Sequence, residues 1–140
     1  MKKLLMTAAT LFALLTPARA DQLPAVYLGQ WCAIAGESNL PGYESYLPLE
    51  EGKCERADRL TIKRNALTAI ESGCRFSSIK KTSDLRPNHT KPTKADWTPV
   101  MEILAKCEGE GVASVVKMRL IYQKGALSIE SKVLRETNTY

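Results

Sequence analysis

The sequence predicts an all-β domain, a small antiparallel up-and-down sheet or barrel of about seven strands stapled by two disulfides. From Arg59 onward, apolar and polar residues alternate as they do in half-buried strands, and short turn-forming pairs interrupt the alternation. Four cysteines follow an N-terminal segment that is typical of exported proteins. Hairpin registers built on the turns set apolar side chains opposite one another.

The first twenty residues have the features of a cleaved secretion signal. Lys2 and Lys3 form a positive region, residues 4–15 are almost entirely apolar, and Ala18-Arg19-Ala20 has the small-x-small pattern of a cleavage site. The apolar stretch is about a dozen residues long, whereas a helical span needs roughly twenty, so we expect no membrane span. We expect residues 21–140 to form a single domain in the periplasm or outside the cell.

Four cysteines, Cys32, Cys54, Cys74 and Cys107, remain after cleavage. Two disulfides are expected in an oxidising compartment, and four cysteines allow three pairings. A metal site is not expected, because the cysteines lack CxxC-type spacing and His89 is the single histidine of the chain.

The alternation of apolar residues and the turn pairs divide the chain into strands and loops. We expect strands near residues 25–33, 59–63, 66–71, 74–82, 97–108, 111–123 and 126–135, and a long loop at 35–57. Tyr27, Gly29 and Trp31 share one face of the first strand, which we place toward the core. Trp97 enters its strand beside a loop and is expected to be less buried than Trp31.

Four predicted turns, at Arg64-Asn65, Ser72-Gly73, Gly109-Glu110 and Lys124-Gly125, fix the expected register. The last turn pairs Tyr122 with Leu127, Leu120 with Ile129, Met118 with Ser131 and Val116 with Val133. The other turns pair Ile103 with Val116, Met101 with Met118, Ile62 with Leu67 and Ala69 with Phe76. Pairing Phe76 with Ala105 brings Cys74 opposite Cys107, which leaves Cys32 for Cys54.

Two resemblances bear on the fold. Tyr27-Leu28-Gly29-Gln30-Trp31, at the start of a run of strands, resembles the GxW signature of lipocalin-type barrels. This resemblance implies a barrel closed at one end by Trp31, with Arg135 of the last strand packed on the ring. The sequences GQWC, ESGC and CEGEG, together with Trp97, resemble a group of small uncharacterised exported bacterial proteins, which implies export, disulfides and a β fold but no activity.

No set of residues commits the chain to a catalytic chemistry. His89 lies in a polar loop bounded by proline, and Glu108 and Glu110 flank a predicted turn, where acidic residues are common. Nucleophilic catalysis needs a nucleophile, a base and an orienting group together, which the sequence does not indicate. We therefore expect neither an enzyme nor a bound cofactor.

Two segments of opposite charge are either solvated loops or a binding rim. Residues 80–94 contain Lys80, Lys81, Arg86, Lys91 and Lys94, whereas residues 37–53 are acidic and contain Tyr43 and Tyr46. Removing Lys2, Lys3 and Arg19 with the signal lowers the formal net charge from +5 to +2, so a nucleic-acid partner is not expected.

The sequence therefore predicts an exported, non-catalytic binding or interaction module, whose partner we expect to be another periplasmic or extracellular protein. The alternative is a lipocalin-like carrier of a small apolar ligand. A wide barrel lined by Phe76, Met118, Leu120 and Tyr122 would favour the carrier, and a filled interior would favour the interaction module.

Overall fold

The computed structural model describes residues 22–34, 42–49, 54–87, 90–93 and 96–138. Within these ranges, eight antiparallel strands form a closed barrel in the order β1-β2-β8-β7-β6-β5-β4-β3. The all-β fold and the two disulfides are therefore confirmed, with one strand more than the sequence predicts.

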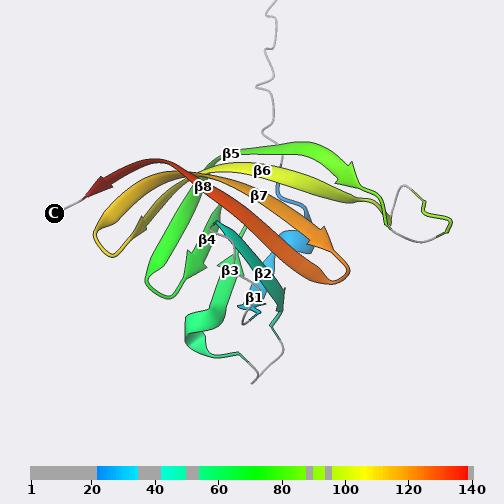
Figure 1. Ribbon diagram of the computed structural model, residues 1–140, viewed down its shortest axis with the longest axis horizontal. Helices are drawn as coiled ribbons and strands as arrows, with labels where there is room; N and C mark the ends of the chain where they lie inside the picture. The colour runs from blue at the N-terminus through cyan, green and yellow to red at the C-terminus, as the bar shows by residue number, and fades with distance from the viewer. Residues whose placement is uncertain (1–21, 35–41, 50–53, 88–89, 94–95, 139–140) are drawn as a thin grey trace, which may run out of the picture.

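The strands differ strongly in length. The elements are η1 (Ala25–Tyr27), β1 (Gly29–Ala33), β2 (Tyr43–Pro48), η2 (Arg56–Asp58), β3 (Arg59–Ile62), β4 (Ala66–Ala69), β5 (Ser72–Leu85), β6 (Thr98–Gly109), β7 (Val112–Gln123) and β8 (Ala126–Asn138), where η marks a 3₁₀ helix. The long strands β5 to β8 form one curved sheet, and the short strands close the barrel beneath it (Figure 1).

The additional strand, β2, lies inside the segment that the sequence predicts as a loop, residues 35–57. Its six residues end at Pro48, which lacks a backbone N–H and is tolerated at a strand end. Strand β1 lies between β2 and β3, so the connection from β2 to β3 has to pass β1. The Cys32–Cys54 disulfide joins β1 to this connection.

Most of the predicted registers are confirmed. These are all four pairs across β7 and β8 (Tyr122–Leu127, Leu120–Ile129, Met118–Ser131 and Val116–Val133), together with Ile62–Leu67, Phe76–Ala105 and Cys74–Cys107. The predicted pairing of Cys74 with Cys107 and of Cys32 with Cys54 is the one observed.

Two predicted turns are wrong, by one and by two residues, which shifts the pairing register by two and by four residues. The β6–β7 turn is Glu110-Gly111, so Ile103 pairs with Met118 rather than Val116, and Met101 pairs with Leu120 rather than Met118. Both turn residues have positive φ, 49° and 75°, as a two-residue hairpin turn requires, with glycine in the second position. The β4–β5 turn is likewise Ile70-Glu71, and Ala69 pairs with Ser72 rather than Phe76.

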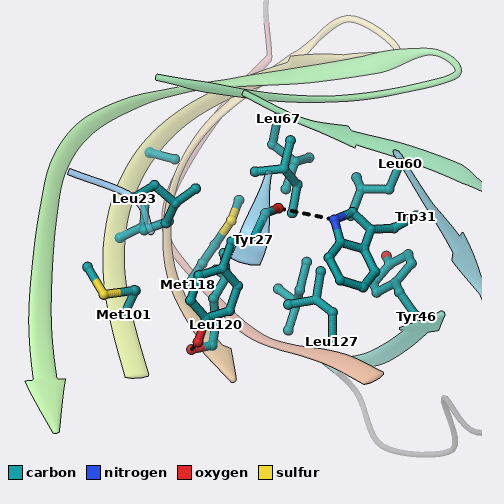
Figure 2. Packing of buried hydrophobic residues seen from close by; sticks show 14 of the residues in the cluster. Leu23, Tyr27, Trp31, Tyr46, Leu60, Leu67, Met101, Met118, Leu120 and Leu127 are labelled. Carbon is teal, nitrogen blue, oxygen red and sulfur yellow. Dashed lines mark hydrogen bonds between the residues drawn. The ribbon is translucent and has the colours of Figure 1, made fainter. Parts of the chain in front are cut away.

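The interior of the barrel is filled by the chain's own side chains (Figure 2). The buried cluster comprises Leu23, Tyr27, Trp31, Tyr46, Leu60, Ile62, Leu67, Met101, Ile103, Ala105, Val116, Met118, Leu120, Leu127 and Ile129. Trp31 is 4% exposed and Trp97 is 40% exposed, as the sequence predicts.

One end of the barrel, which we call the plugged end, is filled by η1 and Trp31. The predicted first strand is wrong in its N-terminal half, because the Tyr27 N–H donates to the Pro24 carbonyl and makes a 3₁₀ turn. The Trp31 Nε1–H then donates to the Tyr27 carbonyl at 3.1 Å (Figure 2). The ring packed edge-on against Trp31 is Tyr122, at 6.1 Å between centroids. Arg135, expected there, is exposed and pairs with Val115 on β7.

The Tyr27 hydroxyl extends the sheet at this end. The last paired residues of β6 and β7 are Met101 and Leu120, and two positions further on, in the same register, Pro99 lies opposite Tyr122. The Tyr27 hydroxyl donates to the Pro99 carbonyl at 2.5 Å and accepts from the Tyr122 N–H at 3.2 Å. A side chain thus bridges the two strands where their ladder ends. Burial raises the pKa of Tyr27 to about 12.

Candidate functional site

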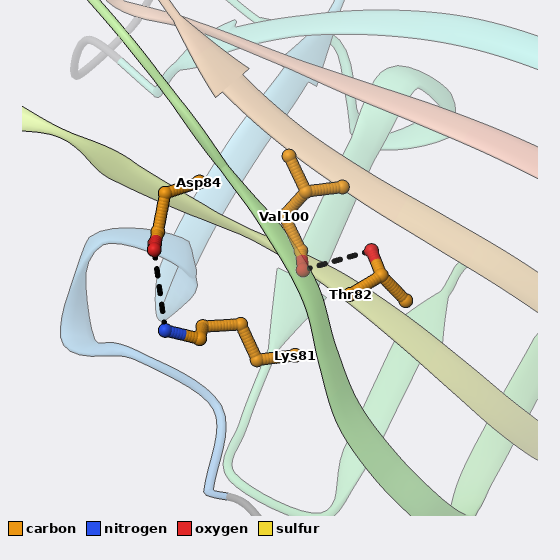
Figure 3. Close-up of polar contacts among 4 residues, drawn as sticks. All are labelled: Lys81, Thr82, Asp84 and Val100. Carbon is orange, nitrogen blue, oxygen red and sulfur yellow. Dashed lines mark hydrogen bonds and ion pairs between the residues drawn. The ribbon is translucent and has the colours of Figure 1, made fainter.

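The structure describes only part of the predicted binding rim. Lys80, Lys81, Arg86 and Lys91 are exposed, and the Lys81 ammonium pairs with Asp84 at 3.2 Å (Figure 3). Lys94 and the side chain of Tyr43 lie outside the part of the chain that the structure describes.

Tyr46 does not present an exposed aromatic ring, which corrects its expected place on a rim. Its side chain is buried in the core, with 7% exposed, and its hydroxyl donates to the Glu44 carboxylate. Burial and the neighbouring carboxylate raise the pKa of Tyr46. The alternation in β2 explains this burial, because Tyr46 lies opposite the buried Leu127 of β8.

The two charged segments lie on opposite sides of the long sheet. The backbone row Lys80, Glu102, Arg119, Glu130 and Tyr43 crosses β5, β6, β7, β8 and β2 in that order. Four strand spacings of roughly 4.8 Å separate Lys80 from Tyr43, about 19 Å along the sheet. The described parts of the two segments therefore do not form one continuous rim.

The edge of β5 beside Lys80 and Lys81 is interrupted by two bulges, at Ser77 and Thr82. At each bulge the hydroxyl donates to a carbonyl of β6, Ser77 to Leu104 and Thr82 to Val100 (Figure 3). Bulges and lysines on an edge strand oppose pairing with another chain. This edge is therefore a poor docking surface for a partner strand.

A cavity lies at the opposite end of the barrel, which we call the open end. This cavity, the cup, has a volume of about 520 Å³. It is lined by Ile70, Glu71, Ser72, Cys74, Cys107, Glu108, Gly109, Glu110, Val112, Ser114, Val133 and Glu136. A volume of this size suits a specific binding site for a small molecule or for side chains of a partner.

The cup continues the inner face of the long strands beyond the core. The row Phe76, Ala105, Val116 and Val133 is the last that contributes to the core, and Cys74, Cys107, Ser114 and Glu136 form the next row. The Cys74–Cys107 disulfide, with its Cα atoms 4.0 Å apart, therefore separates the core from the cup. Ser72, Gly109 and Val112 belong to the row nearest the turns.

Close packing at the rim of the cup explains why residue 109 is a glycine. A Cβ at Gly109 would lie 2.8 Å from the Ser72 Cβ, so a larger residue would push β5 and β6 apart.

The cup combines an apolar floor with carboxylates. Val133 is 54% exposed, and Glu71, Glu108, Glu110 and Glu136 line the same cavity. Lysine and arginine are absent from the described residues that line it. Such a surface is suited to a cationic group carried on an apolar stem.

The patterns in the sequence do not predict the cup as a site. Glu108 and Glu110 stand where turn residues are expected, and Val133 has the same place in the apolar alternation as a core residue. The one available indication was the number of glutamates, at positions 71, 108 and 110, next to the turns of two neighbouring hairpins.

Searches for other kinds of site add two observations. In the described ranges, His, Cys, Asp and Glu side chains form no group of three able to hold a metal ion. None of the helices in those ranges has the length and apolar character that a bilayer crossing requires. Two disulfides are typical of an oxidising compartment.

Comparisons with protein-family models, with curated proteins and with solved structures found no match to this chain. The function of this chain is therefore inferred from the geometry of the barrel and the cup.

Proposed function

We propose that this chain is an exported, non-catalytic binding module that recognises another protein through the cup at its open end. One observation carries the proposal. The interior of the barrel is packed with its own side chains, whereas the cup lies outside the core and exposes apolar and acidic groups together. Exposed apolar surface with a polar rim is typical of interaction sites.

The filled interior argues against the alternative, a carrier of a small apolar ligand. Met118 and Leu120, which would line a wide barrel, are buried within the core cluster, and Phe76 and Tyr122 pack against it. A carrier would need an enclosed apolar cavity that buries most of its ligand. The cup is shallow at Val133 and ringed by carboxylates, which suits a charged partner better than an apolar small molecule.

Export is supported by the signal-like N-terminal sequence and by the two disulfides. We expect N-terminal sequencing of the protein recovered from outside the cytoplasm to begin at Asp21. A product that begins at Met1, or far from Asp21, would contradict this part of the proposal.

Native mass spectrometry of the protein purified from its own host tests the binding function. We expect a retained protein partner, which Val133→Lys releases because the substitution places an ammonium group on the apolar floor and among the carboxylates that would bind the partner. Leu47→Lys is the matched control, because Leu47 is 48% exposed but lies on β2, outside the cup. A retained small apolar molecule would favour the carrier instead.

A further inference from the structure

Half of the β8 edge next to the cup has no strand partner among the described residues. Strand β2 pairs with Leu127–Glu130, and the last described backbone bond on this edge is from the Ser131 N–H to the Gly42 carbonyl at 2.6 Å. A Cβ at Gly42 would collide with the Ser131 carbonyl oxygen, so β2 leaves β8 at a point where only glycine fits. From Lys132 to Asn138, β8 pairs with β7 alone among the described residues.

This edge has the length and surface of a docking strand. Seven residues at about 3.4 Å each give roughly 24 Å of backbone with unused hydrogen-bonding groups. Val133 and Leu134, 54% and 51% exposed, lie on it in succession. Extended peptides bind such edges by adding a strand, with backbone bonds for affinity and alternate side chains for specificity.

The cup lies on the inner face beside the same edge. Val133 and Glu136 of β8 belong to its lining, so a strand added to β8 would direct every second side chain toward the cup. The lining contains four glutamates and, among the described residues, no basic side chain. Charge complementarity therefore favours lysine or arginine at those alternate positions.

We propose that the free edge of β8 accepts an extended, basic segment of a partner protein as an added strand, with alternate basic side chains in the cup. This inference rests on the proposed binding function and names the chemistry of the partner. The added strand would cover Val133 and Leu134, and its cations would lie within reach of Glu71, Glu108 and Glu136.

The β5 edge provides an internal contrast. It is broken by the bulges at Ser77 and Thr82, so its backbone is irregular. The β8 edge carries two basic residues, Lys132 and Arg135, but it has one irregularity, between its partners Val115 and Val116, carries the exposed apolar pair and borders the acidic cup. A basic strand should therefore select β8 over β5.

The test uses the oxidised protein, labelled with ¹⁵N, and two capped probe peptides of eight residues, one alternating Lys and Val and one alternating Glu and Val. We expect the Lys-Val peptide to shift the amide resonances of Lys132–Asn138 and to slow their hydrogen exchange at least tenfold. The Glu-Val peptide should leave them unchanged. Methylation of alternate backbone nitrogens of the Lys-Val peptide should weaken binding at least tenfold, because it removes the ladder bonds.

Two protein variants locate the site. Glu136→Lys should weaken binding of the Lys-Val peptide at least fivefold, whereas Glu55→Lys, the same change at an exposed residue outside the cup, should not. Equal weakening by both variants would show nonspecific charge attraction and would overturn the proposal. Shifts confined to β5, or equal binding of the methylated peptide, would also overturn it.

Sedimentation of the free protein tests whether a second copy of the chain occupies this edge instead. A dimer that protects Lys132–Asn138 without peptide would overturn the proposal of a basic partner. Retention of a Val133-dependent protein partner in native mass spectrometry, combined with no response to the Lys-Val peptide, would leave the binding function standing and reject strand addition.

Discussion

At the plugged end, η1 and Trp31 enter the barrel, and the Tyr27 hydroxyl joins β6 to β7 where their backbone pairing stops. At the open end the same long strands continue past the core, and the inner rows beyond the Cys74–Cys107 disulfide form an exposed cup. The strands are therefore longer than the core requires. In the proposed function, the plugged end stabilises the domain and the open end is the binding surface.

The largest effect is expected for Trp31 of the plug, compared with the exposed Trp97 just before β6. Trp31→Ala should cost about 3–5 kcal/mol of unfolding free energy, because it leaves a cavity in the plug. Trp97→Ala should cost less than about 1 kcal/mol, because the side chain is already exposed. Urea unfolding of both variants, with the disulfides intact, measures this contrast. Similar midpoints for the two variants would mean that the plug contributes little to stability.

Removal of each disulfide tests whether the open end depends on the Cys74–Cys107 bridge. The bridges Cys32–Cys54 and Cys74–Cys107 close segments with sequence separations of 22 and 33 residues, and the chain-entropy account gives each about 3–4 kcal/mol. We expect the double alanine variants of the two pairs to lose similar stability. Of the two variants, only the one at residues 74 and 107 should speed hydrogen exchange of the amides of residue 107 and of Ser114, because it removes the divider between core and cup.

The tyrosine bridge at the plugged end should have an intermediate effect. Tyr27→Phe leaves the Pro99 carbonyl and the Tyr122 N–H without the hydroxyl, which should cost roughly 1–3 kcal/mol. Hydrogen exchange of the Tyr122 amide should accelerate in the variant. Tyr46→Phe is the control, because its hydroxyl bonds the exposed Glu44 carboxylate rather than two strands. An unchanged Tyr122 amide would contradict the bridging role.

The same tyrosine gives the stability a pH dependence. Its pKa rises from 10.0 to about 12 on folding, chiefly because of burial, so the folded state favours the protonated hydroxyl. The stabilisation is complete below pH 10 and is lost as the pH rises from 10 to 12. Unfolding midpoints measured over this range should fall less steeply for Tyr27→Phe than for the wild type.

The sequence was sufficient for the features set by side-chain alternation. The Lys124-Gly125 turn aligned four apolar pairs, and the Phe76–Ala105 pairing placed Cys74 opposite Cys107. Alternation has a period of two, so a register slip by an even number of residues leaves every side chain on its own face. This explains why the turns at Glu110-Gly111 and Ile70-Glu71 were misplaced although the faces were right.

Other features depend on contacts that local patterns do not encode. Strand β2 ends in Pro48 and lies in a segment rich in turn residues, and its pairing with β1 and β8 overrides that composition. The Tyr27 bridge requires Pro99 and Tyr122, which are 23 positions apart in the sequence, to lie opposite each other. No sequence motif predicts this pairing. The cup was missed because alternation does not reveal where the core ends along a strand.

The smallest expected effect on stability is at the boundary between the core and the cup. Val116 and Val133 are the same residue type, lie directly opposite each other on the inner face, and differ in burial, since Val116 is in the core and Val133 is exposed. Val116→Ala should cost roughly 1.5 kcal/mol or more, because it removes two buried carbon groups and leaves a cavity. Val133→Ala should change stability by no more than about 0.5 kcal/mol. Urea unfolding measures both, and peptide binding should show the reverse order, with Val133→Ala the more damaging. If Val133→Ala destabilised the domain as much as Val116→Ala, Val133 would belong to the core. The open end would then contribute to the stability of the fold and would not be a binding surface.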